Sequence, residues 1–374
     1  MISCKATGLV YRNPKPHLRA VHAWHPSIVS LSSRELACSF DLGQAAESLD
    51  YRTYIVHSTD GGYSWSPPQP IIDDPQSRPT THTLRISAVD DGTLVAIGGR
   101  FYRDNPEEGL TNRANMGFVP MDVMLSRSRD RGQSWDSPLT LQPPLIGPAF
   151  EVCHAIVERH DGSWLWPTQT WSGWDGEAPN GMRAIALVSY DRGSTWPQYL
   201  DVMHASDLIH FEQSLVELHD GRLLAVTWRY DPRTQRTHPT PYAISSDGRT
   251  FSQPSETGLR AQTAKLLVLR DGRVLCIYRP DGRDGLWACL ARITGDRWET
   301  LHNTMIWGRA PIGPAAGTTS EMLASLKFGY PQITQLAGGN VLIVFWCLEQ
   351  EVQNIRWIRV DVGDSERQSV TEAM

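Results

Sequence analysis

A short pattern, Ser-x-Asp-x-Gly-x-Ser/Thr-Trp, occurs three times in this chain, beginning at Ser58, Ser128 and Ser189. A shortened copy runs from Ser245 to Phe251, and a remnant at 294–298 keeps only the acid and the indole. Related turns that recur along one chain indicate a repeat protein. The period of the repeat constrains the fold more strongly than any single motif does.

The residue types of this turn indicate a structural role. The Asp accepts hydrogen bonds from nearby backbone amides, the Gly supplies a positive φ, and the Ser or Thr adds a local hydrogen bond. The Trp then packs back against the sheet as one large apolar group. We therefore expect these residues to maintain the fold, and we expect the catalytic carboxylates to lie elsewhere.

A second repeat consists of strand-like hydrophobic runs joined by tight turns. The turns are Asp91-Gly92, Asp161-Gly162, Asp220-Gly221 and Asp271-Gly272, with variants at Gly338-Gly339 and Ser33. Such turns between β-rich runs are hairpin signals. Six hairpins at intervals of roughly 50 to 70 residues predict an all-β fold, a six-bladed β-propeller of four-stranded antiparallel blades. We expect residues 1–362 to form this single domain and residues 363–374 to form a polar, disordered tail.

Composition agrees with this prediction and narrows the partners. The chain has 374 residues, of which 40% are hydrophobic, so it can bury a large core. A net charge of −6 and the lack of a basic stripe argue against nucleic acid. Neither a membrane span nor a signal peptide is visible, and the six cysteines show no paired spacing. We expect reduced core cysteines and a cytoplasmic location, or secretion if a leader was trimmed.

The register of the hairpins indicates where a ligand site would lie. Eight positions before each turn, the innermost strands carry His25, Thr83, Cys153, Glu212, Thr263 and Tyr330. In a propeller these strand starts converge on the central channel, and concave channel mouths are the usual ligand sites. Glu212 and Tyr330 are the pair with useful chemistry. The structural alternative is that Glu212 pairs with an arginine and Tyr330 only fills the channel.

Together with these turns, Phe211-Glu212-Gln-Ser-Leu and Gly329-Tyr330-Pro-Gln-Ile resemble the sialidase (neuraminidase) superfamily, over residues 20–362. The resemblance implies that Tyr330 is the nucleophile and that Glu212 accepts its proton. It also implies that Asp50, just ahead of the strand that begins at Tyr51, is the acid and base. A neutral phenol paired with a carboxylate can attack an anomeric carbon beside a carboxylate without charge repulsion.

The resemblance further implies three arginines that hold the carboxylate of the substrate in bidentate contacts. The candidates are Arg229 for the second ligand, Arg279 or Arg283 for the third, and Arg100 or Arg103 as a substitute for the first. The first blade is expected to read Arg-Ile-Pro, but this chain reads Trp24-His25-Pro26. Trp24 therefore stands at the arginine position, with His25 beside it, and both are candidate substrate-binding residues.

This change leaves three functions open, all of which imply a carbohydrate partner. The first is a sialidase-like glycoside hydrolase that removes a terminal acidic sugar by a retaining mechanism. The second is a propeller-type lyase or another exo-glycosidase on uronate-containing glycans, with His25 or Tyr330 moving the proton. The third is a non-catalytic sugar-binding propeller.

Two further expectations concern the surroundings of the site. Trp171 and Trp174 are candidates for stacking on a sugar face. No cofactor and no catalytic metal are expected, since His82, Glu151 and His154 lie near strand starts without a metal-ligand spacing. The sequence gives no indication of the oligomeric state.

Overall fold

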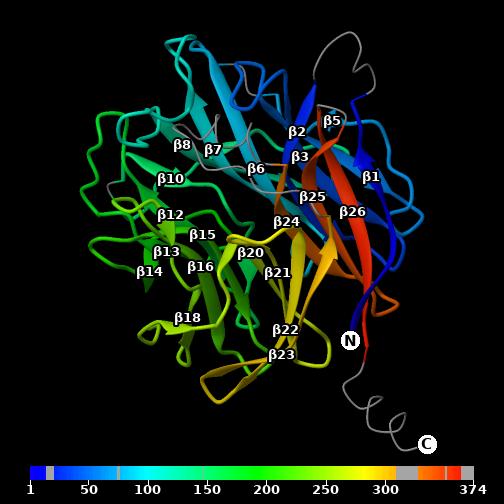
Figure 1. Ribbon diagram of the computed structural model, residues 1–374. Helices are drawn as coiled ribbons and strands as arrows, with labels where there is room; N and C mark the ends of the chain where they lie inside the picture. The colour runs from blue at the N-terminus through cyan, green and yellow to red at the C-terminus, as the bar shows by residue number, and fades with distance from the viewer. Residues whose placement is uncertain (14–20, 74–75, 146, 309–326, 350–351, 364–374) are drawn as a thin grey trace, which may run out of the picture.

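The computed structural model describes residues 1–13, 21–73, 76–145, 147–308, 327–349 and 352–363 (Figure 1). Of the expected tail, residues 364–374 lie outside this described part. Among the described residues, no helix is long and apolar enough to cross a membrane.

The described residues form six antiparallel sheets arranged in a ring, with their innermost strands converging at the position of the expected channel, which confirms the six-bladed propeller (Figure 1). In each of the first five blades four strands follow one another outward in chain order, and blades three and four each add one short strand outside this order. Blade one consists of β2 (His22–Ser30), β3 (Leu36–Gly43), β4 (Arg52–Ser58) and β5 (Gln69–Pro70). Blade two consists of β6 (Thr80–Ala88), β7 (Leu94–Tyr102), β8 (Met121–Ser128) and β9 (Leu139–Thr140). Those of blade three are β10 (Ala149–Glu151), β11 (Val157–Glu158), β12 (Trp164–Trp171), β13 (Ala184–Ser189) and β14 (Gln198–Met203).

The later blades repeat this plan. Blade four consists of β15 (Ile209–Glu217), β16 (Leu223–Asp231), β17 (Arg236–Thr237), β18 (Pro241–Ser245) and β19 (Ser255–Glu256). Blade five consists of β20 (Ala261–Val268), β21 (Val274–Pro280), β22 (Leu286–Thr294) and β23 (Arg297–Trp307). Blade six consists of β24 (Phe328–Gln335), β25 (Val341–Glu349), β26 (Val352–Val362) and β1 (Ile2–Tyr11).

The two ends of the chain close the ring within this sixth blade. Strand β1 pairs antiparallel with β26, so that Ile2 lies opposite Val362. The N-terminal strand is thus the outermost strand of a blade whose other three strands come from the C-terminal end. Radial closure of this kind leaves only short, protected sheet edges.

The repeated turns have the hydrogen bonds that their sequence predicts. Asp60 accepts bonds from the amides of Tyr63 and Ser64 and from the hydroxyls of Ser58 and Ser64. The same serine and threonine contacts recur at Asp130 and Asp191. These carboxylates are occupied by their own turns, which supports a structural role for them.

Gly193, in the third turn, illustrates how closely these turns pack. Its φ is +80°, and a Cβ there would lie 2.9 Å from Trp164. Gly221, in a hairpin turn, has a φ of +85° but open space around it. We expect Gly193→Ala to destabilise the protein by about 1–3 kcal/mol more than Gly221→Ala, because both strain the backbone but only the first overpacks. Chemical denaturation measures this difference, and equal losses would contradict the packing argument.

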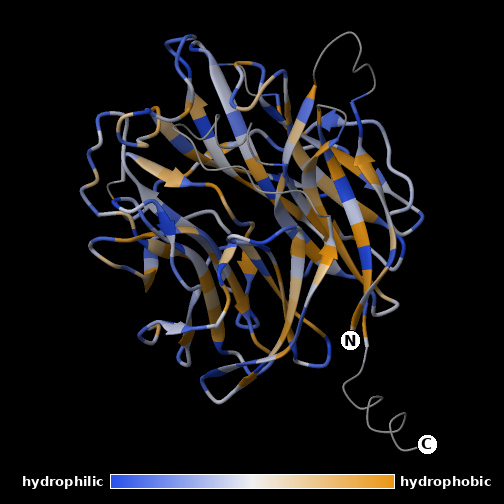
Figure 2. Ribbon diagram, viewed as in Figure 1, coloured by the Kyte–Doolittle hydropathy of each residue, from blue (hydrophilic) through white to orange (hydrophobic). Residues whose placement is uncertain are grey.

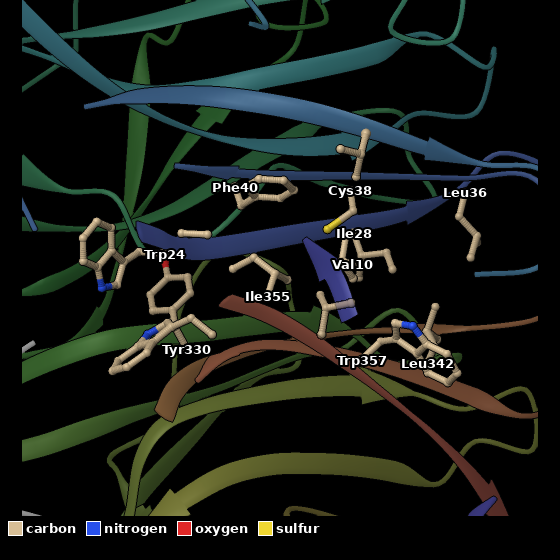
Figure 3. Close-up of a cluster of buried hydrophobic side chains, with 14 of the residues drawn as sticks. Val10, Trp24, Ile28, Leu36, Cys38, Phe40, Tyr330, Leu342, Ile355 and Trp357 are labelled. Atoms are coloured by element: carbon tan, nitrogen blue, oxygen red, sulfur yellow. The ribbon is translucent and has the colours of Figure 1, made fainter. Parts of the chain in front are cut away.

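Hydrophobic side chains fill the space between neighbouring blades. Figure 2 shows apolar residues concentrated along the strands and polar residues in the loops. One cluster joins blades one and six, and Figure 3 shows Trp24 and Tyr330 at one end of it, with Leu36 and Trp357 at the other. All six cysteines are free, and all but the exposed Cys4 are buried as expected.

Candidate active site

Four of the innermost strands carry the same irregularity at the positions that the register analysis selected. Strands β2, β15, β20 and β24 each contain a register shift against their neighbour. The residue within each shift has a left-handed backbone: His25 (φ 48°), Glu212 (φ 46°), Thr263 (φ 50°) and Tyr330 (φ 52°). Bulges re-aim side chains, and left-handed residues other than glycine cluster at functional sites. The repeated bulge marks the channel end of these strands as the candidate site.

Tyr330 lies between two cations. Its hydroxyl donates a hydrogen bond to the carbonyl of Val152 (3.1 Å) and accepts one from Arg85 Nε (3.3 Å). Arg85 Cζ and Lys265 Nζ each lie 5.1 Å from the centre of its ring. Burial raises the pKa of Tyr330 well above its ordinary value, although the charge of Arg85 opposes this shift. The phenol is therefore neutral in the resting site, beside positive charge that favours its ionised form.

Asp41 is the buried anion that balances Arg85. Its carboxylate is fully buried and accepts hydrogen bonds from Thr53 (2.6 Å), Thr83 (2.5 Å) and Arg85 (3.3 Å). Burial acts to raise the pKa of Asp41, but the charge of Arg85 and the hydrogen bonds from His25 and Thr53 outweigh it, so the net shift is downward. Asp41 is thus ionised and fixed in place.

His25 connects Asp41 to Tyr330. Its Nδ1 lies 2.8 Å from the hydroxyl of Tyr51 and 3.4 Å from Asp41 Oδ2. The imidazole lies edge-on to the ring of Tyr330, with 5.0 Å between the ring centres. The side chain is 22% exposed, which makes it more accessible than Asp41 or Arg85. Burial lowers the pKa of His25, and its hydrogen bond to Asp41 only partly opposes this.

Two carboxyl groups meet on another side of the channel. The backbone amide of Glu212 donates a hydrogen bond to Glu151 Oε2 (2.9 Å). Burial and the charge of Glu212 raise the pKa of Glu151 to about 8. Burial also raises the pKa of Glu212, against the charges of Arg279 and Lys265. Glu212 Oε2 is buried without a hydrogen-bond partner among the described residues. The pair therefore retains a proton near neutral pH, and Glu212 has an oxygen available to accept another.

The retained proton predicts an unusual pH dependence of stability. The pKa of Glu151 in the folded state is about 8, above its ordinary value of 4.5. The protonated carboxyl therefore contributes fully to folding stability below pH 4.5, and this contribution is lost as pH rises towards 8. We expect the free energy of unfolding to fall with pH in this window by up to about 1.4 kcal/mol per pH unit relative to Glu151→Gln. Urea denaturation at several pH values tests this, with the exposed Glu299→Gln as control. Parallel curves for the wild type and Glu151→Gln would contradict it.

Two cations from blade five complete the site. Lys265 Nζ donates a hydrogen bond to the carbonyl of Cys153. The guanidinium of Arg279 donates to Gln262 Oε1 (2.9 Å) and to the carbonyl of Phe328 (3.1 Å). Burial lowers the pKa of Arg279 to about 10, against the charge of Glu212. With Arg85, three buried cations thus surround the Tyr330 and Glu212 region.

The structure does not bring Asp50 into this arrangement. Asp50 is exposed in the loop between β3 and β4, where its carboxylate accepts hydrogen bonds from the hydroxyl of Ser48 (2.6 Å) and the amide of Gln44 (3.1 Å). The loop turns back on itself through a bond from the amide of Tyr51 to the carbonyl of Ser48. Asp50 caps this loop. The acidic residue that contacts the buried charged cluster is Asp41, on the preceding strand.

Of the proposed arginine ligands, only Arg279 is among the residues around Tyr330. The other four have partners elsewhere. Arg229 pairs with Glu256, Arg283 is exposed beside Trp287, Arg100 bonds to Asp122 and Thr140, and Arg103 bonds to the carbonyls of Glu47 and Glu108. The sequence register indicates the blade in which each arginine lies, but it does not show the direction in which each long side chain runs.

The proposed aromatic contacts are mainly packing contacts in this structure. Trp24 is 1% exposed, stacks on His22 and packs against Tyr51. Trp171 is 4% exposed and stacks on Phe118. Trp174 is half-buried and packs, like Phe118, against the cluster of Phe101, Leu110 and Val119. Trp24 therefore contributes to the site indirectly, by packing against Tyr51, which contacts His25.

Sequence reasoning did not select Asp41, Tyr51, Arg85 or Lys265, although a signal exists for two of them. Arg85 and Lys265 each stand two positions after a register residue, Thr83 and Thr263; on the regular strand β6 this places Arg85 on the same face as Thr83. A charged residue on the inward face of an otherwise apolar strand is costly to bury unless it is paired. That combination marks both residues as parts of a buried polar site.

The fold is a six-bladed propeller with a cluster of buried charged residues where its innermost strands converge. The model of the BNR repeat-like domain matches residues 55–343, and the chain belongs to this family. No protein of curated function matches the sequence.

Solved structures share the fold at low sequence identity. A protein of unknown function from Dyadobacter fermentans is 22% identical with a TM-score of 0.74, covering 97% of this chain and 99% of that one. The NanB sialidase of Streptococcus pneumoniae is 14% identical with a TM-score of 0.67, covering 96% and 71%. The intramolecular trans-sialidase of Ruminococcus gnavus is 13% identical with a TM-score of 0.63, covering 91% and 94%. These similarities establish the common architecture.

Proposed function

We propose that the protein is a glycoside hydrolase that removes a terminal acidic sugar by a retaining mechanism, with Tyr330 as nucleophile. The observation that carries this proposal is the setting of Tyr330: a buried phenol on a left-handed bulge, hydrogen-bonded to Arg85, with Glu212 on the matching bulge of blade four. A strained, buried phenol between two cations is poorly explained by packing alone.

The charges around Tyr330 suit this chemistry. Arg85 and Lys265 stabilise the phenolate as it forms, and Glu212 accepts the phenolic proton at its unpartnered oxygen. A proton transfer from phenol to carboxylate leaves the net charge of the pair unchanged, so the approach of an anionic sugar is not further opposed. Blade one lacks the expected arginine, since Trp24 stands at its position. Arg85, Lys265 and Arg279 supply the positive charge for the sugar carboxylate in its place.

A panel of aryl glycosides tests the proposal. We expect release of the aryl group from an aryl α-N-acetylneuraminide or an aryl uronide, and none from the matching neutral hexosides, because only the acidic sugars complement the buried cations. Absence of cleavage across the panel, in protein shown to be folded, would contradict the proposal. Calorimetric titration with the free acidic sugars would then test the non-catalytic sugar-binding alternative.

One observation favours a second candidate, a lyase on uronate-containing glycans. An eliminating enzyme needs a base and an acid near one carbon, and His25 and Tyr330 lie side by side with Arg85 next to the phenol. Elimination produces an unsaturated uronate that absorbs in the ultraviolet, whereas hydrolysis does not. Growth of this absorbance on uronate oligosaccharides would establish the lyase and exclude the hydrolase mechanism for those substrates.

A further inference from the structure

Hydrolysis with a tyrosine nucleophile requires a separate group that protonates the leaving oxygen. Asp50 is occupied in capping its own exposed loop. Asp41 is fully buried, and its oxygens accept bonds from Thr53, Thr83 and Arg85. Neither carboxylate is placed to meet a leaving group, so the acid must be another residue near Tyr330.

His25 has the geometry of such a group. One ring nitrogen, Nδ1, is held by the hydroxyl of Tyr51 (2.8 Å) and lies 3.4 Å from Asp41 Oδ2. The other nitrogen, Nε2, has no hydrogen-bond partner among the described residues, and the side chain is 22% exposed. Contact with the ring of Tyr330 fixes the orientation of the imidazole. Its left-handed backbone, φ 48°, is a strain that packing alone does not require.

We infer that His25 is the general acid and base of this site, with Asp41 and Tyr51 as its positioning residues. The inference rests on the proposed hydrolase function and names the residue that completes it. A carboxylate that fixes one imidazole nitrogen, so that the other can exchange a proton with the reactant, is a recurring catalytic arrangement.

The proposed reaction has two halves, which form and then hydrolyse a covalent intermediate on Tyr330. In the first, the Tyr330 oxygen bonds to the anomeric carbon as its proton passes to Glu212. The bond from that carbon to the leaving oxygen breaks with its electron pair, and protonated His25 gives its Nε2 proton to that oxygen. In the second, neutral His25 takes a proton from water, whose oxygen bonds to the anomeric carbon. The bond between that carbon and the Tyr330 oxygen breaks, its electron pair stays on this oxygen, and Tyr330 recovers its proton from Glu212.

The charged groups around His25 determine the pH range of the acid step. Asp41 on β3 acts to raise the pKa of His25, whereas burial and Arg85 on β6 act to lower it, and the net shift is downward. Tyr51 and Tyr330, which also contact the imidazole, have pKa values well above the ordinary range and stay neutral. Cleavage of poor leaving groups should therefore decline as pH rises through the region below the ordinary histidine value of 6.5.

The test compares His25→Gln with wild type on two glycosides of the same acidic sugar, one with a nitrophenyl and one with an alkyl leaving group. Loss of the acid should lower kcat/KM for the alkyl glycoside by about 100-fold or more and for the nitrophenyl glycoside by less than about 10-fold. The decline with rising pH should vanish in the variant. The exposed His204→Gln is the matched control and should behave as wild type.

Equal losses on both leaving groups, with the pH profile retained, would overturn the role of His25 while leaving the hydrolase intact. A wild-type protein that cleaves neither glycoside would instead remove the proposed function on which the inference rests. Tyr51→Phe supplies a milder variant in case His25→Gln fails to fold. It should shift the pH profile and lower kcat on the alkyl glycoside with little change in KM, which a purely structural role would not do.

Discussion

Tyr330→Phe is expected to lower kcat by at least about 1,000-fold on any glycoside that the wild type cleaves. The change removes only the hydroxyl that would bond to the anomeric carbon. That hydroxyl donates to the carbonyl of Val152 and accepts from Arg85 Nε, so its loss leaves one carbonyl and one guanidinium nitrogen with a partner fewer. The ring keeps its packing in the cluster between blades one and six. The variant should therefore fold, and substrate binding should change far less than turnover.

Tyr63→Phe is the matched control, because Tyr63 is exposed and its ring contacts Trp357 outside the channel. It should retain wild-type kcat. A Tyr330→Phe protein that melts like the wild type and turns over within about 10-fold of it would exclude Tyr330 as nucleophile.

Arg85→Met is expected to destabilise the protein by about 3–5 kcal/mol, since removal of one partner of a buried ion pair leaves an uncompensated buried charge. Arg85 is 2% exposed and Asp41 is fully buried. Without the guanidinium, Asp41 keeps its hydrogen bonds from Thr53 and Thr83 but has lost the positive charge that lowers its pKa. Chemical denaturation measures the loss.

Two comparisons isolate the buried pair. Arg129→Met removes one partner of an exposed pair with Asp136 and should leave the denaturation midpoint nearly unchanged. In the double variant Arg85→Met/Asp41→Asn, the second substitution should cost much less than it costs alone, because it removes the stranded charge. Additive losses would show that the two charges do not depend on each other.

The fold could be predicted because similar turn motifs recur from blade to blade and each forms through contacts within a few residues. The turns around Asp60, Asp130 and Asp191 have the hydrogen bonds that their residue types demand. The hairpin glycines Gly92 and Gly221 have the positive φ that the Asp-Gly pairs imply. These features depend on neighbours within a few residues, so the sequence carries them directly. The pairing of β1 with β26 depends on residues at opposite ends of the chain and has no such local signal.

The site was predictable only where the repeat extends to it. The count from the hairpin turns indicates His25, Glu212 and Tyr330, and in the structure each lies in the equivalent bulge of its own strand. The count could not select Asp41 or Arg85, because their role arises from contacts between blades one, two and six. The same limit applies to Arg229, whose long side chain turns to Glu256 and away from the channel. Side-chain direction at a shared site depends on the neighbouring blades, which local sequence does not report.

The role of Tyr330 as nucleophile is tested most directly by trapping the covalent intermediate. The protein would be treated with a fluoride of the acidic sugar that the glycoside panel identifies, carrying a second fluorine beside the anomeric carbon to slow hydrolysis, and its peptides would be mapped by mass spectrometry. We expect one sugar adduct per chain, on Tyr330, and none in Tyr330→Phe. Turnover of substrate by a protein that forms its adduct on a different residue would exclude Tyr330 as the nucleophile.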